Sequence, residues 1–371
     1  MRVVHVHRIA GVGGSERHLL ALLPALREQG VEAAFVGLDT GPGAGAFYDE
    51  LDRSKVAYAR LQGAAADPRL PFRIAHAAGR LGAEAIHTHL VHADVHGAAA
   101  AALLRVPLFS TKHNDDRFRT GAFRHVDRLL ARRATGVIAI SEALRRFSLE
   151  RVGLPAAKVE VVHYGLDAPP PAWGPNPPID LPRDVPWLLA IARLVPQKGL
   201  EVALEALARL ENERAVLVVV GEGPERARLV ELAHRLGVSD RVLLAGRAGD
   251  VGALLERASL LVHPARWEGF GLVLLEAMLA GRAVVATDVS AIPVIVVDEA
   301  TGLLVPPDDP GALARAIDRL LSDDGERERF GNAGRERARA EFSVERMAAQ
   351  TAAVYARAAA RTTASAHEST E

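Results

Sequence analysis

Short apolar runs rich in valine, isoleucine and leucine alternate with longer segments rich in alanine, leucine and arginine along this 371-residue chain. Such runs are typical of buried strands, and the helical segments between them supply the crossovers that parallel strands need. The sequence predicts strands at 3–9, 33–38, 85–88, 108–111, 137–140 and 159–162, and then at 187–191, 216–220, 241–244, 260–262, 283–287 and 302–305. We therefore expect an α/β protein whose parallel sheets are covered by helices on both faces.

A proline-rich segment separates the two sets of strands. Residues 168–186 contain eight prolines, and proline at that density disfavours both helices and sheet ladders. The sequence thus predicts domains at 1–168 and 187–343, a linker at 169–186, and a final amphipathic helix over 344–360 followed by a frayed end. Ligands in such sheets bind at the carboxyl ends of the strands, so a cleft between the two domains is the expected site.

Composition excludes several classes of protein. The chain has no cysteine, which removes disulfides, thiolate nucleophiles and cysteine–zinc sites. A formal net charge of -1 and a pI near 6.9 argue against a dedicated nucleic-acid binder. Because no apolar run is long enough to span a bilayer and the first residues do not resemble a signal peptide, a cytoplasmic location is expected.

The strongest local signal is a pair of glutamates, Glu268 and Glu276, separated by glycines. Gly269 and Gly271 make one continuous helix improbable, so Glu268 is expected in a strand-to-helix loop and Glu276 inside the helix. The backbone amides of residues 269–272 and the positive end of the helix would suit an anion or sugar hydroxyls. The alternative is a capped helix with two solvated glutamates.

Arg193 and Lys198 follow the first strand of the second domain. Two cations at the carboxyl end of a strand suit a diphosphate, with arginine as a planar fork and lysine as a point charge. Surface salt bridges are the alternative. The glycine turn after strand 216–220 is a further strand-to-turn corner, which could serve only to reverse the chain.

Glycines near the start of the chain suggest a second class of function. Gly13 and Gly14 follow the first strand and open a helix, as in dinucleotide-binding turns. Glu16, however, stands where the third glycine of that fingerprint belongs, and its carboxylate would oppose a pyrophosphate. Asp39 lies rather far along to bind a ribose. An NAD-dependent oxidoreductase is therefore kept as a lesser alternative.

Histidines cluster after strand 85–88. His92 and His96 have a spacing that can bind zinc, with Asp94 beside them, but no zinc signature accompanies them. We therefore expect no metal there and favour His89 as a cleft residue, with His87 and His92 as packing residues.

The segment 112–158 is locally basic, with eleven Lys/Arg against five Asp/Glu. Solvated helix faces would explain this excess, and docking on anionic lipid or binding of an acidic acceptor is the functional alternative, in which Phe118 and Phe123 could insert. His113 and Asn114 follow strand 108–111 and are expected to meet an acceptor, unless they form only a polar surface loop.

Seven short motifs follow one another along nearly the whole chain. They are Gly13-Gly14-Ser-Glu-Arg, His87-Thr-His89, Arg193 with Lys198-Gly, Val219-Val-Gly-Glu-Gly-Pro, Glu268-Gly-Phe-Gly-Leu-Val-Leu-Leu-Glu276-Ala, Thr301-Gly-Leu-Leu-Val-Pro-Pro and Phe342-Ser-Val-Glu-Arg-Met. In this order and spacing the chain resembles glycosyltransferase family 4, which comprises retaining nucleotide-sugar transferases with the GT-B fold of two Rossmann-like domains.

The resemblance implies roles for individual residues. His89 and Glu268 are the implied catalytic residues, both beside the donor sugar. The implied donor-binding residues are Gly13, Gly14, Arg193, Lys198, Arg247, Gly269, Phe270, Gly271, Leu272 and Glu276. Arg193 and Lys198 would stabilise the departing diphosphate in place of a metal, so neither a metal nor a cofactor is expected. The final helix would cross back to the first domain.

The implied reaction is metal-independent, retaining transfer of a sugar from a UDP- or GDP-sugar to a hydroxyl acceptor, which could be a sugar, a lipid-linked molecule or a small molecule. Bacterial cell-surface polysaccharide or glycolipid assembly is the implied setting, with peripheral membrane contact left open. The chain departs from the family pattern at four positions, Ala192, Tyr164, Ala291 and Val294. The last two border the donor phosphate in the family, so a catalytically weak nucleotide-sugar-binding protein is the alternative.

Overall fold

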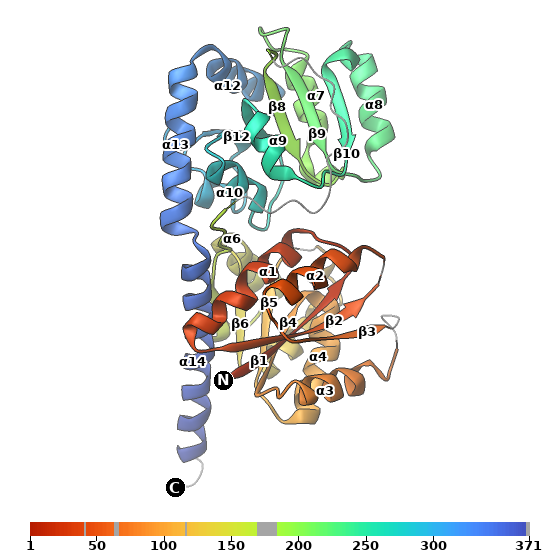
Figure 1. The fold of residues 1–371 in the computed structure, drawn as a ribbon, viewed down its shortest axis with the longest axis vertical. Helices are drawn as coiled ribbons and strands as arrows, with labels where there is room; N and C mark the ends of the chain where they lie inside the picture. The colour runs from red at the N-terminus through yellow and green to blue at the C-terminus, as the bar shows by residue number, and fades with distance from the viewer. Residues whose placement is uncertain (41, 63–66, 116, 169–183, 369–371) are drawn as a thin grey trace. The chain divides into compact units, whose positions relative to one another are not determined.

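The structure is a computed structural model that describes residues 1–40, 42–62, 67–115, 117–168 and 184–368 (Figure 1). The chain divides into two compact units, one formed by Met1–Gly165 with Ser343–Glu371 and the other by Leu166–Phe342. Each unit contains a single parallel sheet. Most of the predicted linker, residues 169–183, lies outside the described residues.

Unit 1 is built on a seven-stranded sheet with the order β3-β2-β1-β4-β5-β6-β7. Its strands are β1 (Arg2–Ile9), β2 (Glu32–Asp39), β3 (Tyr58–Gln62), β4 (Ala85–His89), β5 (Leu108–Lys112), β6 (Gly136–Ala139) and β7 (Val159–Val161). The central strands β4 and β5 are buried at every position, as expected of parallel strands covered on both faces. Six of these seven strands were predicted, and β3 was missed.

Helices cover both faces of this sheet. They are α1 (Gly14–Ala25), α2 (Gly45–Arg53), α3 (Leu70–Arg80), α4 (Leu90–Leu104), α5 (Arg124–Arg133), α6 (Glu142–Arg146) and α14 (Val344–Glu368). Right-handed crossovers place α1 and α2 on one face and α3, α4 and α5 on the other. In agreement with this, α1 contacts α2 and α14, while α3 packs against α4 and α4 against α5.

The final helix α14 packs on α1 and β6 within unit 1. Its large apolar residues Met347, Val354 and Tyr355 are each 1% exposed, which explains the amphipathic pattern. The helix extends to Glu368, eight residues beyond the predicted end at residue 360.

Unit 2 is built on a six-stranded sheet with the order β10-β9-β8-β11-β12-β13. The strands are β8 (Trp187–Ile191), β9 (Val216–Val220), β10 (Val242–Gly246), β11 (Leu260–His263), β12 (Ala283–Thr287) and β13 (Leu303–Val305). The helices are α7 (Leu200–Leu207), α8 (Arg226–Arg235), α9 (Val251–Arg257), α10 (Leu272–Leu279), α11 (Ile292–Ile295), α12 (Pro310–Ser322) and α13 (Asp324–Glu341). All six strands match the prediction to within two residues at each end.

The strand order reverses once in each sheet. In unit 1 the reversal lies between β1 and β4, and in unit 2 between β8 and β11. The chain leaves the two strands at such a point toward opposite faces, and ligands of open α/β sheets bind at the carboxyl ends of these strands. The fold therefore directs attention to the residues that follow β1, β4, β8 and β11.

Among the described residues, no helix is both long enough and apolar enough to cross a membrane.

Candidate functional site

Lys198 and Glu268 meet at the strand reversal of unit 2. Lys198 ends a short 3-10 helix (Pro196–Lys198) after β8, and Glu268 lies in the loop between β11 and α10. The Lys198 ammonium forms an ion pair with Glu268, and each side chain is only 12% exposed. His263, the last residue of β11, places its Nε2 3.0 Å from the same Glu268 oxygen. The structure thus brings together two of the predicted residues and adds His263, which sequence reasoning missed.

Several contacts hold the two loops against each other. The amide of Arg266 donates to the Gln197 carbonyl at 2.9 Å, and the Gln197 side-chain amide donates to the Trp267 carbonyl at 3.0 Å. Gly199 has a φ of 59°, and a β-carbon built there would lie 2.1 Å from the Pro264 carbonyl oxygen. Only glycine allows so close an approach without a shift of the backbone. The placement of Lys198 therefore depends on its glycine neighbour.

The electrostatics of this group keep Glu268 ionised. Burial raises the pKa of the Glu268 carboxyl, but the charge of Lys198 and the hydrogen bond from His263 outweigh burial and lower its pKa to about 2. A buried carboxylate in this state accepts hydrogen bonds from hydroxyl groups. The partnered ammonium beside it is a cation at the carboxyl ends of β8 and β11.

The helix α10 begins at Leu272, four residues after Glu268. Gly271 caps it with a φ of 99°, so the amides of residues 269–272 lie at its positive end. Glu276 lies within α10 as predicted and is fully buried, and Phe270 is 1% exposed. Since neither Glu268 nor Glu276 is exposed, the alternative of two solvated glutamates is wrong.

Arg193 and Arg247 follow β8 and β10, which lie on either side of β9 in the sheet, and they do not join the Lys198 ion pair. Arg193 is exposed after β8. Arg247, after β10, pairs with Glu222 at 2.9 Å, and both side chains are largely exposed. Arg247 thus forms an ion pair at the surface of unit 2.

The glycine turn after β9 does more than reverse the chain. A β-carbon at Gly221 would lie 1.9 Å from the Ala192 carbonyl oxygen, and one at Gly223 would lie 2.3 Å from that of Leu194. The Leu194 amide donates to the Glu222 carbonyl at 2.9 Å. The turn thus packs against the residues before and after Arg193 and supports the loop that carries it.

In unit 1, His89 ends β4 and belongs to a buried network of histidines. His89 Nδ1 lies 3.0 Å from His113 Nε2, and His89 Nε2 lies 2.9 Å from His5 Nδ1. Tyr355 of α14 approaches His87 Nδ1 at 2.6 Å and His5 Nε2 at 3.5 Å. Two further contacts end the network, from His113 Nδ1 to the Tyr164 hydroxyl and from His87 Nε2 to the Thr111 hydroxyl at 2.8 Å.

Every group in this network is satisfied when all the hydrogen bonds are donated in the same direction along it. If Tyr164 donates to His113, each histidine can accept at Nδ1 and donate from Nε2, until His87 donates to Thr111. The reverse direction satisfies the groups equally. Every imidazole can therefore be neutral while both its nitrogens are hydrogen-bonded.

Burial keeps these imidazoles neutral. Desolvation lowers the pKa of His5 and of His18 to about 3 and lowers the pKa of His87, His89 and His113 well below its usual range. His89 can therefore offer a hydrogen bond but not a positive charge. The ring of His18 stacks on Tyr164 with centroids 4.3 Å apart.

The same network contains the one set of three side chains, among the described residues, whose atoms are close enough to hold a metal ion. These are His5, His87 and His89, with ligand atoms within 4.8 Å of one another, and all their ring nitrogens have partners in the network. The possible zinc ligands considered from the sequence, His92, His96 and Asp94, are different residues. The carboxylate of Asp94 is buried and turned toward Lys112 at 2.6 Å.

The Gly13 turn is occupied by the chain itself. The Gly13 amide donates to Glu16 at 3.0 Å, and the other Glu16 oxygen lies 3.1 Å from His7 Nε2. Gly14 is the first residue of α1. Asp39 accepts from Tyr48 and from Arg60, so its carboxylate is also engaged.

The basic segment 112–158 is less exposed than its composition suggests. Lys112 is buried between Asp94 and Asp127, and Arg119 is buried against Asp127. Lys158 donates to the carbonyls of Arg132 and Ala134. Asn114 is exposed, whereas its neighbour His113 is 5% exposed and belongs to the histidine network.

Three of the four departures from the family pattern make structural contacts. Tyr164 closes the histidine network through its hydroxyl. Ala291 is buried as the cap of α11, and the carbonyl of Val294 accepts from Arg337 at 2.9 Å. Sequence analysis missed two members of the histidine network, His5 on β1 and Tyr355 on α14. The only signal in the sequence was a polar residue type at an otherwise apolar position.

Comparison with known proteins identifies the family of the chain. Residues 12–168 match the family described as Glycosyltransferase Family 4, and residues 177–337 match Glycosyl transferases group 1. The chain is similar to the alpha-maltose-1-phosphate synthase of Mycobacterium tuberculosis, with 31% identity over 92% of this chain and 95% of that protein. It is also similar to a D-inositol 3-phosphate glycosyltransferase of Xylanimonas cellulosilytica, with 32% identity over 75% and 73% of the two chains.

Solved structures confirm the fold. Anabaena Alr3699/HepE in complex with UDP and glucose matches with a TM-score of 0.82 and 22% identity over 96% of this chain and 99% of that one. The sucrose-phosphate synthase of Thermosynechococcus elongatus matches with a TM-score of 0.77 and 24% identity over 97% and 99%. With two parallel-sheet units, the predicted motifs at their strand ends and these relatives, the chain belongs to glycosyltransferase family 4 and is a glycosyltransferase of GT-B fold.

Proposed function

We propose that this glycosyltransferase moves a sugar from a UDP- or GDP-sugar to a hydroxyl acceptor with retention of configuration and without a metal ion. The observation that carries the proposal is the Lys198–Glu268–His263 group at the strand reversal of unit 2, beside the positive end of α10. It combines a cation, an ionised carboxylate and backbone amides, which suit a diphosphate and the hydroxyls of a sugar.

The departing diphosphate needs stabilisation as its bond to the sugar breaks. Lys198 and Arg193 supply positive charge, and the amides at the start of α10 supply oriented dipoles. Groups of this kind contribute about 3–4 kcal/mol each to transition-state stabilisation in other enzymes. We assign the diphosphate to Lys198 and Arg193, the sugar hydroxyls to Glu268, and the ribose to Glu276.

In unit 1 we assign His89 a role at the reacting sugar as a neutral hydrogen-bonding group. Its low pKa excludes a standing positive charge, and its contacts with His5 and His113 fix the ring. His113 and Asn114 remain our candidates for acceptor contact.

Relatives support a nucleotide-sugar donor. HepE from Anabaena has been solved with UDP-glucose as well as with UDP and glucose. Two other structures of the same fold are named for lipopolysaccharide synthesis, which supports a role in cell-surface polysaccharide or glycolipid assembly. A lipid-linked acceptor would fit that setting.

A donor screen tests the proposal. Thermal unfolding is followed with UDP, GDP, ADP, NAD and the sugar conjugates, all with EDTA present. A ligand at 100 times its dissociation constant stabilises a protein by about 2.7 kcal/mol, which is readily measured. Stabilisation by one nucleoside diphosphate, with slow release of sugar from its conjugate, is the expected result. Binding without any turnover would instead indicate a nucleotide-sugar-binding protein, and no response to any nucleotide would overturn the proposal.

A further inference from the structure

Exposed apolar side chains gather on three adjacent helices of unit 1. Of the eight large apolar side chains that are exposed among the described residues, five lie on α3, α4 and α5. They are Phe72 (64% exposed), Val95 (39%), Leu103 (49%), Val126 (41%) and Leu129 (55%). Single exposed apolar residues need no explanation, but a cluster on one face does.

The charges on the same three helices have one sign at the surface. Arg80, Arg124, Arg132 and Arg133 are exposed, and Arg73 and Arg128 are half-buried. All residues of these helices are described, and their only carboxylates, Asp94 and Asp127, are 3% and 1% exposed. The outer face of α3, α4 and α5, which we call the α3–α5 face, is therefore apolar and cationic without an exposed acid.

The two carboxylates are absent from this face because Lys112 holds them inside. Its ammonium lies 2.6 Å from Asp94 and 3.1 Å from Asp127. The lysine is 3% exposed, so this pairing belongs to the interior. The surface arginines of α5 therefore have no exposed carboxylate on their own helix with which to pair.

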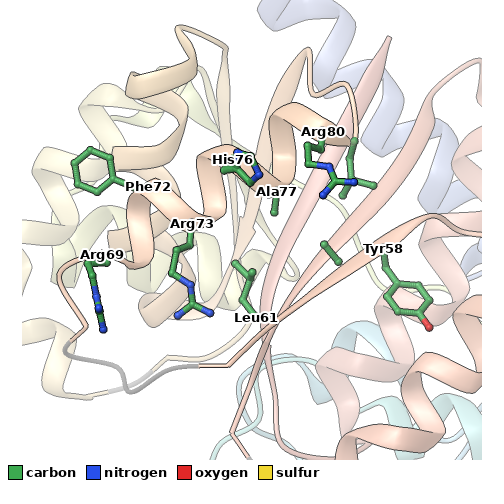
Figure 2. Close-up of a pocket in the computed structure, with 10 residues that line it drawn as sticks. Tyr58, Leu61, Arg69, Phe72, Arg73, His76, Ala77 and Arg80 are labelled. Atoms are coloured by element: carbon green, nitrogen blue, oxygen red, sulfur yellow. The ribbon is translucent and has the colours of Figure 1, made fainter.

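A groove adjoins this face at the edge of the sheet. It has a volume of about 910 Å³ between β3 and α3, and its lining includes Tyr58, Arg69, Arg73, His76 and Arg80 but no acid. Figure 2 shows Arg73 directed toward Leu61 of β3, while Phe72 is directed away from that strand. A second hollow of about 460 Å³ lies on the α4 side of α3 and shares Phe72, His76 and Arg80. Asp67 offsets part of the charge through its contacts with Arg69 and Arg73.

The charge pattern decides between occupants. A second copy docked by the same face would bring arginines against arginines, because symmetric dimers pair a surface with itself. An anionic partner is required. Apolar side chains that protrude singly from three helices, between alanines and arginines, match a fluid lipid surface, into which each can insert separately.

We propose that the α3–α5 face docks on a membrane that contains anionic phospholipid, with Phe72, Leu103 and Leu129 inserted and the lipid phosphates held by arginines along α3 and α5. The groove between β3 and α3 has the size and charge to hold a headgroup phosphate. The docking itself is inferred from the surface alone. Its purpose, access to a lipid-linked acceptor, rests on the proposed function.

Vesicle sedimentation tests the docking directly. The full chain is mixed with vesicles of phosphatidylcholine alone or with added phosphatidylglycerol, at low and at high salt. We expect binding to the phosphatidylglycerol vesicles that weakens with salt. Arg80→Glu with Arg132→Glu should lower the partition coefficient by at least about tenfold, because each arginine near an anionic surface contributes about fivefold. Phe72→Ser with Leu129→Ser should lower it at both salt concentrations.

A matched variant in unit 2 serves as the control. Val230 on α8 is 54% exposed and Arg235 lies on the same helix, which also carries the exposed Glu231. Val230→Ser with Arg235→Glu should leave vesicle binding unchanged. Equal binding to both kinds of vesicle, or equal weakening by the control variant, would overturn the proposal. A dimer in light scattering that the α3–α5 variants dissociate would replace the membrane with a second copy. Donor binding is measured without vesicles, so failure of docking and failure of the proposed function are distinguishable.

Discussion

The ammonium of Lys198 pairs with the carboxylate of Glu268, a residue 70 positions later in the chain, where both side chains are only 12% exposed. The pair joins the loop after β8 to the loop after β11, the two strands that flank the reversal of the unit 2 sheet. It is therefore part of the fold before any ligand binds.

Removal of the lysine charge should destabilise the protein strongly. Lys198→Met leaves Glu268 buried with only His263 as its partner, and loss of one member of a buried pair costs about 3–5 kcal/mol. Lys198→Met combined with Glu268→Gln should recover part of that loss. Urea unfolding measures both, and Arg214→Met, which breaks an exposed pair with Asp184, should change stability by less than about 1 kcal/mol. A similar small loss for Lys198→Met would show that the buried pair is not structural.

Gly199→Ala should destabilise unit 2 and displace Lys198. The substitution adds strain at a φ of 59° and a clash with the Pro264 carbonyl, so a loss of about 2 kcal/mol or more is expected. Gly237→Ala isolates the strain alone, since Gly237 has a φ of 69° and nothing within 4 Å of a built β-carbon. Thermal unfolding of the two variants should therefore differ, and equal losses would mean that the approach to Pro264 is unimportant.

Acid should destabilise unit 1 well before it reaches the carboxylates. The folded pKa of His5 and of His18 is about 3, and that of His87, His89 and His113 is also well below the unfolded value of about 6.5. Below about pH 6.5 the unfolded chain binds more protons, so stability rises with pH and is lost as pH falls.

Each such histidine contributes about 1.4 kcal/mol per pH unit within that window. Glu268 acts in the same direction at lower pH, because its depressed pKa of about 2 makes its stabilisation disappear as the carboxylate is protonated. Scanning calorimetry between about pH 8 and pH 5 should show a steep fall in Tm below about pH 6.5, and His18→Phe should reduce the slope. A flat Tm over this range would contradict the buried neutral network.

Tyr355→Phe should weaken the histidine network from the side of α14. The hydroxyl of Tyr355 contacts both His87 and His5, so its loss leaves buried nitrogens unsatisfied at a cost of about 1–3 kcal/mol. Tyr58→Phe, which removes a contact with Asp52 at an exposed site, is the control and should cost much less. Nitrogen NMR should also show a change of tautomer in the Tyr355 variant, whereas unchanged imidazole signals would argue against one connected network.

Twelve of the thirteen strands among the described residues could be predicted because they are short runs rich in apolar residues, and most of them are buried. The missed strand β3 is at the sheet edge, with Arg60 and Gln62 exposed and Tyr58 and Leu61 half-buried, so its sequence lacks the apolar signal. The strand order, and with it the reversals at β1/β4 and β8/β11, depends on long-range pairing that no local pattern records.

Only part of the site could be predicted, because its contacts also depend on residues that are far apart in the chain. Lys198 and Glu268 stood out through their motifs, but their ion pair and the contribution of His263 required the fold. His5 lies within the predicted strand 3–9, and the structure shows it as a fully buried link to His89. Arg247 was named through the family resemblance alone, and its contact with Glu222 at the surface could not be predicted from the local sequence.

The most direct test of the account is calorimetric titration of UDP and GDP into the wild-type protein and into Lys198→Met, with EDTA present and folding checked by circular dichroism. We predict that the wild type binds one of the two nucleotides and that Lys198→Met binds it at least about 30-fold more weakly, because a charge-assisted contact to phosphate is worth about 2 kcal/mol or more. Equal affinities of a folded Lys198→Met and the wild type would contradict the assignment of the diphosphate to Lys198.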